Sequence, residues 1–136
     1  MTGGAKVINL SLGTTTASLN DRFAYQRMYG EGVLIVASAG NNESSDYLFP
    51  ASFDQVISVG AVDANNNHAV FSQYNDQVEL VAPGVGVRST IPNNRYETHG
   101  HVFYASLHLL SSSSYTVLIV GGNTDRGQGH RWRHLM

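Results

Sequence analysis

Gly32-Val33-Leu34-Ile35-Val36-Ala37-Ser38-Ala39-Gly40-Asn41 is the stretch that determines the fold class of this chain. Its residues 33–37 form a continuous apolar run, which is typical of a strand buried on both faces of a parallel sheet. After this run the sequence changes to small residues and asparagine, which favour a turn. The stretch therefore predicts a central strand that ends in a polar loop, and ligand sites of parallel sheets form at such strand ends.

The sequence before this stretch completes a βαβ unit. Residues 7–12, Val-Ile-Asn-Leu-Ser-Leu, are rich in β-branched and apolar side chains and predict a first strand. Residues 17–30 predict a helix, with Ser18 or Asn20 as its N-cap and Gly30 at its end. A strand, a helix and a second strand joined by short connections form a right-handed crossover, so the two strands are expected to run parallel.

Two further apolar runs, residues 56–62 and 78–82, predict additional strands. The fold class is therefore α/β, with a mostly parallel sheet of about four to five strands and accompanying helices. The chain has 136 residues, of which 42% are hydrophobic and 13% are charged. This composition is the opposite of the one that keeps chains disordered, so one folded domain is expected.

Composition also excludes several classes of function. A net charge of −2, with one lysine, argues against a dedicated nucleic-acid binder. Because cysteine is absent, disulfides, thiolate zinc sites and thiol nucleophiles are excluded. No apolar run approaches the 18 residues of a membrane-spanning helix, and the first residues do not have the pattern of a signal peptide. We therefore expect neither a nucleic-acid nor a membrane partner.

The composition changes near residue 98. Residues 1–98 hold nine acidic and five basic side chains, whereas residues 99–136 hold one acidic side chain, three basic side chains and five of the six histidines. We interpret residues 1–98 as the folded part and residues 99–136 as a divergent tail. Within this tail, residues 102–110 fit either a helix or a strand, residues 115–120 predict a strand, and the last fourteen residues predict an exposed end.

Two predicted strand ends have the composition of a binding site, namely Ser11-Leu12-Gly13 and Ser38-Ala39-Gly40-Asn41-Asn42. Small residues at a strand end allow the backbone of a ligand to approach closely. An asparagine there can donate its side-chain amide to an oxygen that develops negative charge. Taken alone, these residues fit an ordinary turn equally well.

Four blocks of the sequence resemble subtilisin-like serine peptidases, in the order and with the spacings found in that family. They are Val7-Ile8-Asn9-Leu10-Ser11-Leu12-Gly13, the stretch of residues 32–41, the stretch of residues 49–62 that begins Phe49-Pro50-Ala51, and residues 71–92 around Ala82-Pro83-Gly84. The resemblance covers roughly residues 5–98. It implies a partial subtilisin-like three-layer core, and a parent activity that hydrolyses extended polypeptides through an acyl-enzyme.

The resemblance also implies roles for particular residues. Asn41 corresponds to the asparagine that donates its amide to the oxyanion of the tetrahedral intermediate. The strand that binds an extended polypeptide through its backbone corresponds to Ser11, Leu12 and Gly13. One wall of the pocket for the side chain before the scissile bond corresponds to Ser38, Ala39 and Gly40, and residues 49–51 correspond to part of its floor.

In some members of the family, carbonyl groups that correspond to Ala51, Phe53 and Val56, with an acidic residue near Glu79, hold a cation. Hard cations need about six oxygen ligands, and the spacing of these residues does not establish such a set. We therefore predict no metal site and no cofactor.

The catalytic triad of this family needs a serine nucleophile, a histidine base and an aspartate. In the family the aspartate and histidine precede the first block, so we expect them to lie before Met1. The nucleophile belongs to a Gly-Thr-Ser motif, which does not occur in this sequence; its place holds Thr98-His99-Gly100-His101-Val102. Ser106 and residues 111–114 are the remaining serines for an alternative triad, and His99, His101 and His108 are the candidates for a metal site; we interpret all of them as ordinary polar residues.

The sequence therefore predicts a fragment of a serine endopeptidase that has no catalytic activity alone. Two alternatives stay open, a peptide-binding or decoy module and a half-enzyme completed by a separate chain. A shifted reading frame after residue 98 would explain the missing motif, and it predicts that another frame of the gene reads Gly-Thr-Ser near residue 100. Members of the family are commonly secreted, but no location is predicted for this chain.

Overall fold

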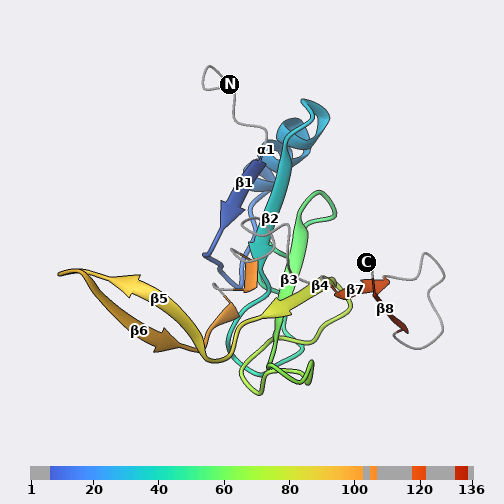
Figure 1. Cartoon of the computed structure of the whole chain (residues 1–136). Coiled ribbons are helices and arrows are strands. Elements are labelled where there is room, and N and C mark those ends of the chain that lie inside the picture. The colour runs from blue at the N-terminus through green and yellow to red at the C-terminus, as the bar shows by residue number, and fades with distance from the viewer. Residues whose placement is uncertain (1–6, 103–104, 107–117, 122–130, 135–136) are drawn as a thin grey trace.

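The computed structural model describes residues 7–102, 105–106, 118–121 and 131–134 (Figure 1). Within these ranges the elements follow one another in this order: β1 (Val7–Leu10), α1 (Leu19–Gly30), β2 (Leu34–Ser38), β3 (Ile57–Val62), β4 (Val78–Pro83), β5 (Val87–Ile91), β6 (Arg95–His99), β7 (Leu118–Gly121) and β8 (Arg131–His134). The backbone is also helical at Val102, Ala105 and Ser106. None of the helical segments described is long and apolar enough to cross a membrane.

The main sheet confirms the expected α/β fold. Its strand order is β1-β2-β3-β4-β7-β8. The first four strands are parallel neighbours, and β7 and β8 join antiparallel. Strand β7 overlaps the strand predicted over residues 115–120 and extends one residue beyond it. Within the last fourteen residues, for which an exposed end was predicted, residues 131–134 form β8 and pair with β7.

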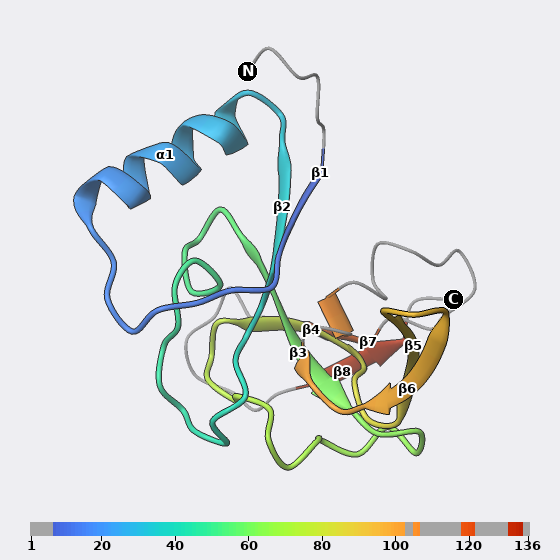
Figure 2. The ribbon, with the colours of Figure 1, turned by 90° about the vertical axis from the view of Figure 1, so that its left-hand side faces the viewer.

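Residues 35–38 of strand β2 are buried on both faces of the sheet, as the apolar run predicts, whereas Leu34 is exposed. Ile35 and Ala37 pack on one face with side chains of α1 and of residues 49–56. Val36 packs on the opposite face, where Val102 and Ala105 cover it. Figure 2 shows α1 beside β1 and β2 on the first of these faces. The polar loop after β2 therefore follows a stretch of strand that is buried on both faces.

A separate hairpin of β5 and β6 was not predicted as an element, although residues 89–92 belong to a block of the family resemblance. The two strands pair antiparallel from Val87 opposite His99 to Ile91 opposite Arg95, and the hairpin projects away from the main sheet (Figure 1). Its turn contains Asn93 and Asn94, both with positive φ, and paired asparagines of this kind are a hairpin signal.

Helix α1 begins one residue after the predicted N-cap, Ser18. The Ser18 side chain accepts a hydrogen bond from the backbone N–H of Asp21 at 3.1 Å, and the Asp21 carboxylate accepts one from the Ser18 backbone N–H at 3.1 Å. The Ser18 hydroxyl also donates to that carboxylate at 2.8 Å. These hydrogen bonds hold the pKa of Asp21 below its ordinary value of 3.8. The capping box therefore depends on an ionised Asp21.

We expect Ser18→Ala to lower the free energy of unfolding by about 1 kcal/mol, because the helix loses its N-cap. The Asp21 carboxylate stabilises the fold above its ordinary pKa, and this contribution is lost as the pH falls below about 3.8 through the lower pKa of the folded state. Urea unfolding at pH 7 and pH 3 measures both effects. Ser45→Ala, in the exposed loop after β2, is the control and should change neither value.

Candidate functional site

The two predicted strand ends lie side by side at one edge of the sheet. Strands β1 and β2 are parallel, with Leu10 opposite Ala37, so residues 11–13 and residues 39–42 leave the sheet at the same end (Figure 1). This confirms that Asn41 follows the carboxyl end of the central strand beside the end of the first strand. The candidate site therefore lies where parallel sheets place their ligands.

Residues 11–13 are accessible to a ligand. Ser11, Leu12 and Gly13 are all exposed, and Leu12 keeps 58% of its surface in contact with solvent. The next residue, Thr14, exchanges two backbone hydrogen bonds of 2.8 Å with Phe49, which anchors this segment to the predicted pocket floor. An open segment held at its end in this way can receive an extended peptide backbone.

The predicted pocket wall is buried and rigidly held. Ser38 and Ala39 are 4% and 2% exposed, and the Ala39 backbone N–H donates to the Val59 carbonyl at 2.9 Å. Gly40 has a φ of +121°, and a side chain at this position would meet Leu48 and Gln73. Glycine is therefore required where the chain turns from β2 toward Asn41.

Gln73 fixes the loop around Asn41, and sequence reasoning missed it. The side chain is 1% exposed, its Oε1 accepts a hydrogen bond from the Asn42 backbone N–H at 2.9 Å, and its own backbone N–H donates to the Gly40 carbonyl at 3.1 Å. A glutamine between polar residues resembles a surface residue, so only its neighbours in space reveal this role.

The Asn41 side chain lies against the segment where the family's nucleophile motif was expected. Its Oδ1 accepts a hydrogen bond from the Val102 backbone N–H at 2.9 Å, although the two residues are 61 positions apart in the sequence. Because a backbone N–H requires an acceptor, this bond turns the Nδ2 amide away from Val102. Among the described residues, no hydrogen bond engages that Nδ2.

Backbone contacts hold this segment in place. The His101 backbone N–H donates to the Gly84 carbonyl at 2.9 Å, and Val102 is fully buried. A methyl group added at Gly84 would lie 2.7 Å from the Ala61 side chain, so this close approach also depends on glycine. The structure thus places a valine beside Asn41 where the family resemblance leads one to expect a serine.

Only some of the other residues considered for catalysis or metal binding belong to the part of the chain that the structure describes. Ser106 is fully buried, and His99 lies 3.6 Å from the Glu97 carboxylate. His108 and residues 111–114 lie outside the described residues. Within the described ranges, no group of three or more His, Asp or Glu side chains is placed to hold a metal ion.

Two residues of the possible cation site have defined surroundings. The Phe53 carbonyl accepts a hydrogen bond from the Val56 backbone N–H at 2.9 Å. Partial burial raises the pKa of Glu79. Neither observation establishes the set of about six oxygens that a hard cation needs.

A pocket of about 170 Å³ opens beside Leu12. Its walls come from the end of β1, the start of α1 and the segment with Phe49, and its lining residues are Leu12, Thr14, Thr16, Asp21, Tyr25, Phe49, Pro50 and Phe53. Burial and the nearby Asp21 charge raise the pKa of Tyr25, so its hydroxyl stays protonated at neutral pH. The pocket is mainly apolar and aromatic, with one anionic group at its rim.

Comparisons with known proteins agree with the sequence resemblance. A model of the subtilase family matches residues 1–115. Alkaline elastase YaB from Bacillus sp. (strain YaB) is 41% identical over 106 residues, which are 78% of this chain and 28% of that protein. Subtilisin DY from Bacillus licheniformis is 41% identical over 115 residues, which are 82% of this chain and 42% of that protein.

A solved structure also matches. The subtilisin-like protease Apa1 from the Antarctic psychrotroph Pseudoalteromonas sp. AS-11 superposes with a TM-score of 0.64 at 49% identity, over 65% of this chain and 20% of that one. The chain therefore spans less than half the length of each of these relatives.

Proposed function

Since the chain belongs to the subtilase family of serine peptidases, we propose that it is a partial catalytic domain that binds extended polypeptide but does not hydrolyse it alone. Residues 11–13 form its substrate strand, Ser38, Ala39 and Gly40 form one pocket wall, and Asn41 is the oxyanion donor. The triad is absent from these 136 residues. The peptidase family implies that the ligand of this partial domain is a polypeptide.

One observation carries this proposal. The hydrogen bond between Asn41 Oδ1 and the Val102 backbone N–H joins the proposed oxyanion donor to the segment that replaces the nucleophile motif. With Oδ1 as an acceptor, the Nδ2 amide is the group that we propose as the donor of an oxyanion hole. The residue beside it, Val102, has no hydroxyl and cannot attack a carbonyl carbon. Binding geometry is thus retained without a group that forms an acyl-enzyme.

A peptide-binding or decoy module is the alternative, and the exposure of Leu12 favours it. Such a module uses the same residues and differs only in the purpose of binding. In both cases the binding residues named above lie within residues 1–98, and Val102, from the divergent stretch of residues 99–136, holds the Asn41 side chain. A frame shift near residue 98 remains a prediction that the nucleotide sequence of the gene decides.

A titration with a blocked apolar tetrapeptide, followed by ¹⁵N NMR, tests the proposal. We expect shifts at Leu12, Gly13, Ala39 and the Asn41 side-chain amide, and no cleaved peptide by mass spectrometry. Leu12→Asp should weaken binding about tenfold or more, because it places a charge in an apolar contact. Tyr96→Asp, on the distant hairpin, is the control. Shifts confined to other residues, or cleavage of the peptide, would contradict the proposal.

A further inference from the structure

Gln73 binds the two peptide groups on either side of the Asn41 α-carbon. Its backbone N–H donates to the Gly40 carbonyl at 3.1 Å, and its side-chain Oε1 accepts a hydrogen bond from the Asn42 backbone N–H at 2.9 Å. The Gly40 carbonyl belongs to the peptide group before the Asn41 α-carbon, and the Asn42 N–H belongs to the one after it. Because peptide groups are planar, holding both of them fixes the two backbone torsion angles of Asn41.

The side-chain amide of Gln73 is itself held in one orientation. Its Nε2 donates to the Asp46 carbonyl at 3.4 Å, so Oε1 is the atom that faces the Asn42 N–H. The side chain is 1% exposed and packs tightly, because a β-carbon at Gly40 would lie 2.8 Å from Oε1. A buried amide that uses both its donor and its acceptor is a rigid support for the loop.

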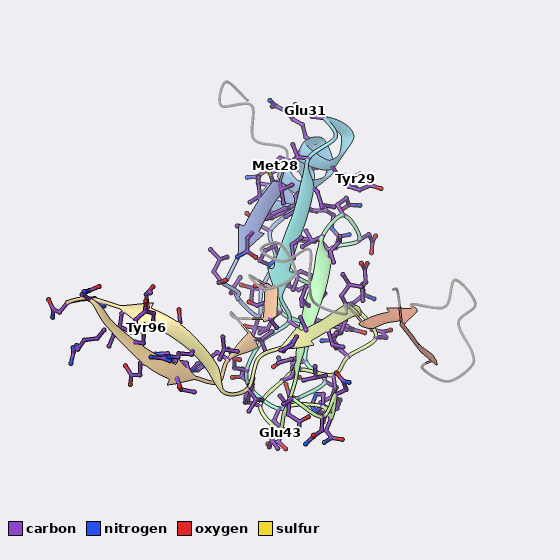
Figure 3. The ribbon with its side chains drawn as sticks, in the orientation of Figure 1. Met28, Tyr29, Glu31, Glu43 and Tyr96 are labelled. Carbon is purple, nitrogen blue, oxygen red and sulfur yellow. The ribbon has the colours of Figure 1, made fainter. Side chains whose placement is uncertain are left out.

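Other hydrogen bonds join the same two segments farther from Asn41. The Glu43 backbone N–H donates to the Phe71 carbonyl at 3.0 Å, and the Asn75 Nδ2 donates to the Asp46 carbonyl at 2.8 Å. Figure 3 shows Glu43 among the loops at this end of the molecule. These bonds hold the segments together, whereas the bonds of Gln73 act on the peptide groups next to Asn41.

The Asn41 side chain is held at its far end by Val102, whose backbone N–H donates to Oδ1 at 2.9 Å. Val102 is buried, and the preceding residue, His101, is bonded to the Gly84 carbonyl. A rotation of the Asn41 backbone would therefore weaken the bond to Val102, because Val102 is not free to follow. The backbone amide of Val102 thus reports on the orientation of the Asn41 side chain.

We propose that Gln73 is a positioning residue, which fixes the backbone of Asn41 and thereby the direction in which Nδ2 meets a negatively charged ligand oxygen. The inference rests on the proposed function, because it concerns how the same site orients its donor. Donors of an oxyanion hole act through preorganisation, so a rotated side chain loses its effect while the peptide-binding strand stays intact. Since the Gln73 side chain is buried, it acts through Asn41 and not on the ligand.

Hydrogen exchange of the unliganded chain, followed by ¹⁵N NMR, provides the first test. Gln73→Met keeps an unbranched side chain of similar size but removes the acceptor of the Asn42 N–H. We expect the Val102 amide to exchange about threefold to tenfold faster, as a weakened hydrogen bond implies. The rate is read relative to that of the Ala39 amide, which donates to the Val59 carbonyl and reports a general loss of stability.

Two further variants make this test specific. Gln73→Glu keeps the acceptor, and burial favours its protonated carboxyl, which can donate to the Asp46 carbonyl as the amide does. At pH 5 it should restore the protection of Val102. Asn75→Ala removes a hydrogen bond from the same loop away from Asn41, so the relative rate of Val102 should stay unchanged. If Gln73→Met does not fold, Gln73→Leu makes the same deletion.

A pair of peptides tests the consequence for binding. Two blocked apolar tetrapeptides share one sequence, but one ends in a free carboxylate and the other in an amide. The carboxylate offers a negatively charged oxygen to the Asn41 Nδ2, so we expect it to bind about threefold to tenfold more tightly. Gln73→Met should abolish this preference without changing the affinity for the amide peptide, whereas Asn75→Ala should retain the preference.

The outcomes separate this inference from the proposed function. An unchanged relative exchange rate of Val102 in Gln73→Met, or an equal increase in Asn75→Ala, overturns the positioning role. A chain that binds both peptides equally, or a preference that survives Gln73→Met, overturns the direction assigned to Nδ2. If neither peptide binds while the exchange rates change as expected, the proposed function fails and the positioning of Asn41 by Gln73 stands.

Discussion

Replacing Gly40 by alanine is expected to lower the free energy of unfolding by about 2–5 kcal/mol. Two costs add up at this position. Its φ of +121° strains any residue with a β-carbon. The added methyl group would also overlap the Leu48 side chain and lie 2.8 Å from the Gln73 Oε1, which cannot move without releasing Asn42. Urea unfolding followed by circular dichroism measures the change.

Gly32→Ala is the matched control. Gly32 also has a positive φ, +79°, but nothing lies within 4 Å of the position that its β-carbon would take. It therefore reports the backbone strain alone, about 1–2 kcal/mol. If the two variants lose the same stability, the packing of Leu48 and Gln73 against Gly40 is not what the structure indicates.

Phe53→Ala is expected to lower the free energy of unfolding by about 3–5 kcal/mol. The ring is 3% exposed and stacks with Tyr25 at 5.2 Å and Phe49 at 4.9 Å between ring centroids. The Arg22 guanidinium lies over its outer side at 5.7 Å. Removing the ring leaves a cavity that joins the pocket beside Leu12 and loosens α1 from the sheet. Thermal unfolding by calorimetry measures this loss.

Phe23→Ala, on α1, is the control for Phe53→Ala. Phe23 is 64% exposed, so its truncation should change stability by about 0.5 kcal/mol or less. A large loss at Phe23 would mean that the outer face of α1 is already covered in the isolated chain. That result would conflict with the exposure of Tyr29 on the same helix, which is 61% exposed and points away from the molecule (Figure 3).

The parallel part of the fold was predictable because its signals are local. The apolar run of residues 33–37 indicated a strand buried on both faces, and Ser18 at the start of a helical pattern indicated the N-cap. The adjacency of Asn41 to the end of β1 followed from the βαβ unit together with the order of the blocks that resemble the family. These predictions needed local sequence, one general rule of chain topology and the family resemblance.

The remaining features depend on contacts between distant residues. Gln73 holds the loop around Asn41 from 31 positions away from Asn42, and Val102 orients Asn41 from 61 positions away. Nothing in the local sequence of a glutamine or a valine reveals such partners. The hairpin of β5 and β6 has a local sequence signal in the paired residues Asn93 and Asn94 at its turn. Strand β8 was missed because its polar sequence resembles an exposed tail.

We propose that these 136 residues retain the binding and oxyanion part of a subtilase site without the catalytic nucleophile. Incubation with a fluorophosphonate probe, followed by intact mass spectrometry, tests this proposal directly. We expect the mass of the chain to stay unchanged under conditions in which subtilisin DY is labelled. Stoichiometric labelling of a single serine in the isolated chain would contradict it.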